Sequence, residues 1–122
     1  METVGTGAGN INLTFQIGSA WYKYFTFRRL NSTTGIYTNE DISTKTFSFF
    51  LKKNKGDRVK IFNLTNLKGI TIPVYTTNQI RIDLNGSQTS IEQGEYYWEL
   101  RRTDLNQPYL SGLASFVYDS PQ

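Results

Sequence analysis

The stretch of residues 94–102 constrains the fold of this chain more than any other. Side chains alternate between two faces along a β-strand, and this stretch alternates throughout. The apolar residues Tyr96, Trp98 and Leu100 share one face, whereas Glu95, Tyr97, Glu99 and Arg101 share the other. A buried aromatic side chain removes roughly 150–250 Å² from water, so we expect Trp98 to make the largest single contribution to a core.

The composition predicts an all-β domain. The chain has 122 residues, of which 15% are aromatic, and alternating segments recur along it. We expect strands at residues 11–17, 21–28, 46–53, 58–64, 79–84, 94–102 and 109–118. Segment 70–75 contains Pro73, which lacks the ladder donor, and is an edge strand or an irregular crossover. The strands differ in length, and Pro73 marks an edge strand, which a closed barrel would not have. Both features favour a single antiparallel β-sandwich of seven to eight strands over a closed barrel.

Other segments are predicted to connect the strands. Residues 31–41 are rich in turn residues and form the longest loop, and residues 85–94 have room for one helical turn. In the strand 21–28, Lys23 shares a face with Trp21 and Phe25. Either the Lys23 stem lies along the edge of the core, or a bulge shifts the register there.

Residues 1–10 are predicted to form a flexible N-terminal arm, and residues 11–120 are predicted to form the folded domain. Gly5, Gly7 and Gly9 make this arm costly to order. Their spacing resembles a phosphate-binding loop, but neither a preceding strand nor a following helix is predicted. We also expect no signal peptide and no membrane span, because no basic segment followed by a long apolar run is present.

The residue inventory argues against catalysis. The chain contains neither Cys nor His, which excludes cysteine nucleophiles, disulfides and thiolate or imidazole metal ligands. Two carboxylates, Glu95 and Glu99, share a strand face but would lie about 13 Å apart at the usual strand rise. We therefore expect no enzyme activity, no cofactor and no metal site. Net charge is +3, and the basic run at 52–55 is interpreted as a solvated hairpin tip, so no specific nucleic-acid partner is expected.

Four aromatic side chains are predicted to point away from the core: Tyr22, Tyr24, Phe50 and Tyr97. Tyr is enriched at the anchors of protein interfaces, so this set is a candidate protein-binding surface. Two other interpretations are a platform on which sugars stack and a sheet face partly covered by loops.

Several segments resemble, in order, the immunoglobulin-like sandwich of tailed-phage virion structural proteins. The first pair is Leu-Thr-Phe-Gln-Ile-Gly-Ser at 13–19 followed by Tyr-Phe-Thr-Phe at 24–27. The next is Asp-Ile-Ser-Thr-Lys-Thr-Phe-Ser-Phe at 41–49. The most recognisable is Thr-Ser-Ile-Glu-Gln-Gly-Glu-Tyr-Tyr-Trp-Glu-Leu at 89–100, and Leu-Ser-Gly-Leu-Ala-Ser-Phe-Val closes the series at 110–117. The resemblance covers about 11–119.

This resemblance implies a fold and a function. The fold is a single immunoglobulin-like antiparallel β-sandwich, as in upper-baseplate, tail-fibre and head-fibre proteins. The function is that of a virion structural protein, assembled in the host bacterial cytoplasm and present in several copies that hold other virion proteins. Adaptor members of the family usually continue into a further domain, so we expect a small accessory module of head or tail. A carbohydrate-binding module for adhesion to the host surface is the alternative.

Overall fold

The computed structural model describes residues 2–4 and 9–118, and it confirms an all-β chain. Eleven strands and one short helix are present in these ranges: β1 (Glu2–Val4), β2 (Gly9–Asn10), β3 (Leu13–Gln16), β4 (Trp21–Asn31), β5 (Ile36–Asn39), β6 (Phe47–Lys52), β7 (Phe62–Asn66), β8 (Gly69–Thr71), β9 (Gln79–Leu84), α1 (Gly86–Thr89), β10 (Gly94–Arg102) and β11 (Gln107–Val117). None of the described segments is a helix long and apolar enough to cross a membrane.

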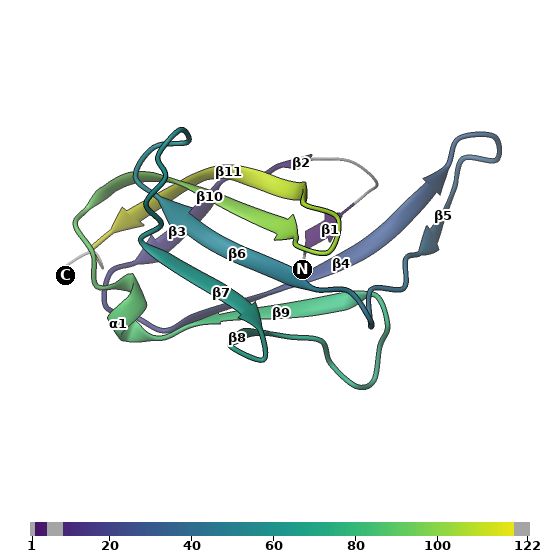
Figure 1. The fold of residues 1–122 in the computed structure, drawn as a ribbon, viewed down its shortest axis with the longest axis horizontal. Coiled ribbons are helices and arrows are strands. Elements are labelled where there is room, and N and C mark those ends of the chain that lie inside the picture. Colours follow the sequence, from purple (N-terminus) through teal and green to yellow (C-terminus); the bar gives the residue numbers. More distant parts are fainter. Residues whose placement is uncertain (1, 5–8, 119–122) are drawn as a thin grey trace.

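Strand β10 lies between β6 and β11, antiparallel to both (Figure 1). Its burial alternates as predicted, with Tyr96, Trp98 and Leu100 facing the core. Trp98 is 0% exposed, and its indole Nε1 donates a hydrogen bond to the carbonyl oxygen of Ile11 at 2.9 Å. The predicted strand, its register and the burial of Trp98 are therefore confirmed.

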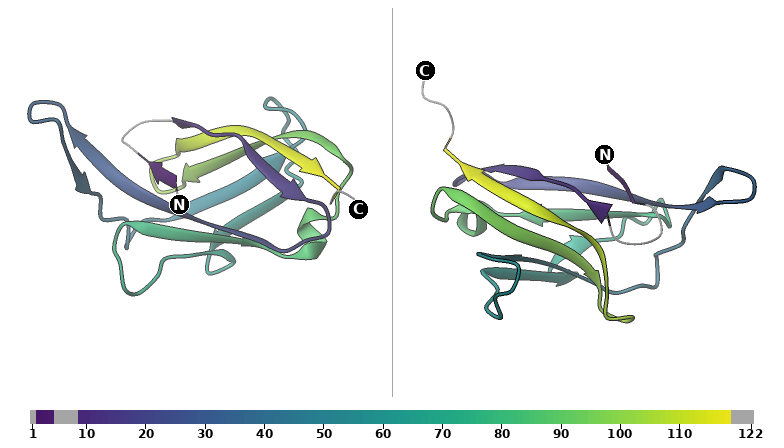
Figure 2. Two further views of the ribbon diagram at one scale, coloured as in Figure 1. Left: turned by 180° about the vertical axis from the view of Figure 1, so that it is seen from behind. Right: turned by 90° about the horizontal axis from the view of Figure 1, so that it is seen from above.

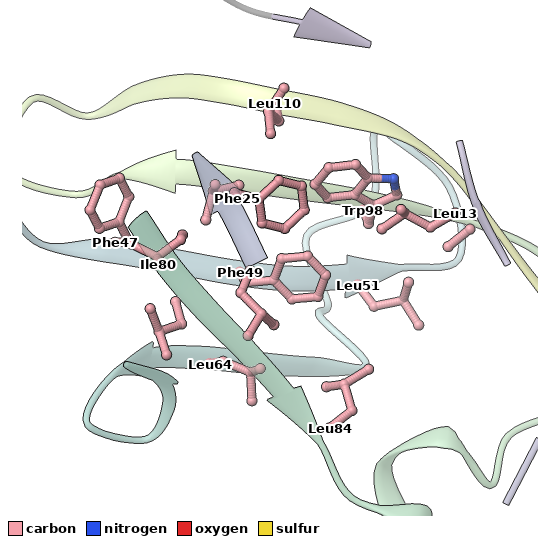
Figure 3. Close-up of a cluster of buried hydrophobic side chains, with 14 of the residues drawn as sticks. Leu13, Phe25, Phe47, Phe49, Leu51, Leu64, Ile80, Leu84, Trp98 and Leu110 are labelled. Carbon is pink, nitrogen blue, oxygen red and sulfur yellow. The ribbon is translucent and has the colours of Figure 1, made fainter. Parts of the chain in front are cut away.

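The strands form one mixed sheet that curls back on itself, in the order β1-β4-β9-β8-β7-β6-β10-β11-β2. The curl places β4 and β9 over β6 and β10 (Figure 2). Across the resulting core, Phe25 of β4 lies 6.2 Å from Trp98, and Phe27 lies 5.5 Å from Phe47, measured between ring centroids. Figure 3 shows aromatic rings of both layers meeting there.

The prediction of a purely antiparallel sandwich is wrong. Four ladders are parallel: β1 with β4, β2 and β3 with β11, and β7 with β8. The two layers are also joined through β8, which pairs with both β7 and β9. Eleven strands replace the seven or eight expected, since the short strands β1, β2, β5 and β8 are too brief to show alternation.

The predicted N-terminal arm contains two of these short strands. β1 pairs with β4, and β2 pairs with β11. Residues 1 and 5–8 of the arm, and residues 119–120 of the predicted domain, lie outside the described residues. The flexibility of the arm stays a prediction.

The segment predicted as the longest loop is a hairpin instead. β4 extends to Asn31, and β5 returns antiparallel to it. The turn suits its residues, because the Asn31 side-chain oxygen accepts a hydrogen bond from the Thr33 amide at 2.9 Å, and Gly35 takes a positive φ of 71°. The hairpin projects well beyond the rest of the sheet (Figure 1).

The observed elements test four local predictions. Lys23 pairs with Ile82 in unbroken register, so the bulge is excluded and its half-buried stem follows the core edge. The expected strand at 58–64 begins only at Phe62, and Val59 before it is exposed. Segment 70–75 is strand only to Thr71 and then crosses irregularly, while the helical turn predicted in 85–94 is α1.

Candidate binding surfaces

The four aromatic residues predicted to face outward divide into two pairs on opposite layers. Tyr22 and Tyr24 lie on β4, whereas Phe50 lies on β6 and Tyr97 on β10. The layers meet through their inward side chains, so the outward side chains of β4 and β10 point in opposite directions. The predicted set is therefore not one surface.

The first surface is the tyrosine–arginine patch, made of Tyr22, Tyr24, Tyr75 and Arg81. The two β4 rings meet edge to face at 6.2 Å between centroids. Arg81 of β9 lies opposite Tyr24 in the ladder, and its guanidinium carbon is 4.3 Å from the Tyr22 ring centroid. An arginine over an aromatic face is attracted by the ring quadrupole, and the contact holds both side chains in place.

Hydrogen bonds fix the orientation of this arginine. Its Nε donates to the Asp83 carboxylate at 3.0 Å, and its Nη1 donates to the Tyr24 hydroxyl at 3.3 Å. The bonds to Asp83, and secondly to Tyr24, raise the pKa of Arg81, so the guanidinium stays charged. A hydrogen bond with Tyr24 likewise raises the pKa of the Tyr75 phenol, which stays neutral at physiological pH. The patch presents a fixed, charged Arg81 that is paired with Asp83 and packed against tyrosine rings.

The patch remains open to solvent. Tyr22 is 61% exposed and Tyr75 is 73% exposed, and Val74 beside Tyr75 is exposed as well. Tyr75 and Arg81 were absent from the predicted site. Arg81 occupies the outward position of an alternating strand, which was a usable signal, whereas Tyr75 follows Pro73 in an irregular segment that has no periodicity.

The second surface is the lysine–aromatic face, made of Phe50, Tyr97, Lys52, Lys55, Lys60 and Arg101. Phe50 points outward as predicted, but it is only 4% exposed. The ammonium groups of Lys60 and Lys52 lie 4.5 Å and 5.2 Å from its ring centroid. The expectation of an exposed Phe50 is therefore wrong, because lysine side chains from its own strand and from the following segment cover the ring.

Tyr97 is also more enclosed than predicted. Its hydroxyl donates to Glu99 Oε1 at 3.1 Å, and the Lys55 ammonium lies 5.9 Å from its ring centroid. Burial is the main cause that raises the pKa of Tyr97. The other Glu99 oxygen pairs with Arg101 Nε at 3.4 Å. The basic run is thus more than a solvated tip, since its lysines pack over aromatic rings.

A third exposed feature is the β4–β5 hairpin. All four residues of β5 are exposed, with Ile36 at 61% and Tyr37 at 55%. Within the described residues β5 pairs only with β4, so one edge of its backbone is open. An open edge of this kind accepts a further strand.

The carboxylates do not gather into a site. Glu95 is exposed, and Glu99 is held by Tyr97 and Arg101. No cluster of three or more His, Cys, Asp or Glu able to hold a metal ion occurs among residues 2–4 and 9–118. What the described surface offers is contact chemistry: aromatic rings, fixed cations and an open strand edge.

Comparison with known proteins adds little to this geometry. No family model and no curated protein matches the chain. One similar solved structure is that of the NK cell receptor Nkp44, described as a triggering partner in natural cytotoxicity. The two share 13% identity at a TM-score of 0.39, over 93% of this chain and 100% of that one. A likeness this distant carries no argument about fold family or function.

Proposed function

We propose that the chain is a non-enzymatic structural protein of tailed-phage virions. In this proposal it is an immunoglobulin-like β-sandwich module, present in several copies, that holds other virion proteins as a head-fibre, capsid-bound, tail or baseplate accessory. The order of sequence segments over residues 11–119 supports the phage resemblance. The layered packing of β4 and β9 on β6, β10 and β11 is compatible with a sandwich of this type.

The observation that carries a protein-binding role is the tyrosine–arginine patch. Tyr and Arg are the residue types over-represented among the side chains that dominate binding free energy. Here they are already fixed: Arg81 is stacked on Tyr22 and bonded to Asp83 and Tyr24. A surface ordered before binding loses less conformational entropy when a partner docks.

The experiment combines the purified chain with the products of its neighbouring virion genes and measures complex size by light scattering. We expect a complex with at least one of them. Arg81→Ala should weaken it by about fivefold or more, as for an interface residue worth over 1 kcal/mol. Tyr118→Ala is the matched control, since Tyr118 is 64% exposed but lies outside the patch.

A chain that stays monomeric and binds none of these proteins would overturn the proposal. The identity of the bound partner also places the module, because capsid proteins indicate a head position and tail proteins a tail position.

Carbohydrate binding is the second candidate. The exposed ring of Tyr75 and the outer part of Tyr22 are the observation that favours it, since sugars stack on accessible aromatic faces. Arg81 already occupies one face of Tyr22, which leaves less room for stacking. A glycan array tests this function: binding that disappears in Tyr22→Ala and Tyr75→Ala supports it, and an array without a hit eliminates it.

A further inference from the structure

The lysine–aromatic face contains a pocket of about 380 Å³ between the outward side chains of β6 and β10. The two strands pair here in antiparallel register, with Lys52 opposite Tyr97, Phe50 opposite Glu99 and Ser48 opposite Arg101. Lys60 reaches the same pocket from the segment between β6 and β7. A pocket of this size is at the small end for ligand sites and matches one or two amino-acid side chains.

Positive charge exceeds negative charge around this pocket. Its walls hold the three cations Lys52, Lys60 and Arg101 and one carboxylate, Glu99, which already pairs with Arg101. Neither Lys52 nor Lys60 forms an ion pair with any residue in the described ranges. Like charges held close together repel each other, and an anion from outside the chain would relieve that repulsion.

Arg101 adds an independent observation. Its Nη1 nitrogen is buried and makes no hydrogen bond with any described residue. A buried donor without an acceptor is rare and costs free energy, so Arg101 brings an uncompensated donor, as well as its charge, to the wall of the pocket. A carboxylate suits an arginine well, because its two oxygens match the planar guanidinium.

We infer that this pocket binds carboxylate side chains of an acidic segment in a partner protein. Lys52, Lys60 and Arg101 supply the charge, and the hydroxyl of Thr103 and the amide of Asn106 line the same walls. Single-stranded nucleic acid fits less well, because it binds by stacking bases on open aromatic faces. Here lysine ammonium groups already lie over the rings of Phe50 and Tyr97.

The pocket stands apart from the tyrosine–arginine patch, since the two lie on opposite layers. An experiment can therefore disprove acidic-segment binding without disproving the proposed assembly role, and the reverse. If the Arg81→Ala variant loses its virion partner but still binds an acidic peptide, this inference stands.

The test measures binding of a fluorescently labelled oligo-glutamate peptide to the full chain by anisotropy at low salt. We expect Lys52→Gln and Lys60→Gln each to weaken binding about two- to fivefold, as for one partly screened charge pair. Both variants keep much of the aliphatic stem that covers Phe50, and thermal melting checks that they fold. The matched control is Lys68→Gln, because Lys68 is exposed and lies outside this pocket.

Three further ligands set the specificity: oligo-glutamine, single-stranded oligothymidine and inorganic phosphate. Binding of oligo-glutamate that falls with added salt and is not matched by these ligands supports the inference. The inference is overturned if oligo-glutamate does not bind, or if Lys68→Gln weakens binding as much as Lys60→Gln does. It is equally overturned if oligothymidine or phosphate competes as strongly as the peptide and with the same dependence on Lys52.

Discussion

At the scale of single residues, Trp98 does more than fill space. Its ring lies 5.5 Å from Phe49 and 6.2 Å from Phe25 between centroids, so it contacts both layers of the curled sheet. Its indole nitrogen also holds the carbonyl oxygen of Ile11, in the segment between β2 and β3. One side chain therefore joins β10, β6, β4 and the N-terminal part of the chain.

Trp98→Ala should lower the free energy of unfolding by about 3–5 kcal/mol, the range for removing a large buried aromatic side chain. Trp98→Phe keeps most of the packing but loses the hydrogen bond to Ile11, so it should cost less. Denaturant unfolding measures both. A loss below about 1 kcal/mol in Trp98→Ala would contradict the register of β10 described above.

Gly112 allows a close backbone contact. A Cβ atom at this position would lie 1.9 Å from the Ile11 carbonyl oxygen, which is the oxygen that Trp98 binds. Gly112→Ala should force this segment away from β11 and destabilise the protein by about 1–3 kcal/mol, as overpacked sites do. Gly56→Ala is the control for the same unfolding measurement, because nothing lies within 4 Å of its Cβ position. Equal stabilities for the two variants would refute the close contact.

Arg102 and Asp104 form an ion pair that makes stability depend on pH. The nearly buried Arg102 donates to both Asp104 oxygens and to the Tyr109 hydroxyl. Its hydrogen bonds lower the pKa of Asp104 below its usual 3.8. A carboxylate with a depressed pKa stabilises the fold above its unfolded pKa, and this contribution is lost as the pH falls through the folded value.

The melting temperature should therefore fall below about pH 4 less steeply in Asp104→Asn than in the unmodified chain. Asp104 is partly exposed, so the difference should be small. Melting curves recorded from neutral pH down to acid pH test it. Identical slopes for the two proteins below about pH 4 would show that the pair contributes nothing.

At the scale of elements, the β4–β5 hairpin has little support from the rest of the described fold. A two-stranded hairpin without a packed face is marginally stable in water, and every residue of β5 is exposed. Backbone amides of β5 should exchange with solvent far faster than those of β10, which lies between two strands over the core. Hydrogen exchange followed by mass spectrometry or NMR measures this, and equal protection in the two strands would mean that the hairpin packs against something.

Elements with strict alternation were predictable from the sequence, whereas short ones were not. β9 and β10 alternate over their whole length, and both were placed almost to the residue. β5 has only four residues, so its Ile36 and Tyr37 were absorbed into a loop rich in turn residues. The outward direction of a side chain was also predictable, but its exposure was not. Alternation placed Phe50 outward, and part of its cover comes from Lys60, which no spacing rule connects to it.

At the scale of the whole molecule, the topology depends on the pairing of segments that lie far apart in the sequence, and this pairing could not be predicted. The antiparallel pairing of β10 with β11 follows from two strands connected by a turn. The parallel pairing of β3 with β11 joins a strand near the start of the sequence to one near its end, with Leu13 opposite Ala114. No local sequence pattern encodes a pairing over this distance. For the same reason, the sequence suggested one aromatic surface where the curl of the sheet produces two.

These two surfaces give the molecule two separate sides for contact. The tyrosine–arginine patch belongs to the layer of β4 and β9, and the lysine–aromatic face to the layer of β6 and β10. In the proposed roles, one copy can therefore touch two different neighbours at once.

The pairing of β3 with β11 has a mechanical consequence. The two strands run parallel, with Leu13 opposite Ala114 and Gln16 opposite Val117, and they lie near the two ends of the chain. Tension that draws the two chain ends apart pulls these strands along each other in opposite directions, so all hydrogen bonds of their ladder carry the load at the same time. In an antiparallel pair pulled from one end, the hydrogen bonds would break one after another. A module tethered by its two ends would therefore resist being pulled open at this ladder.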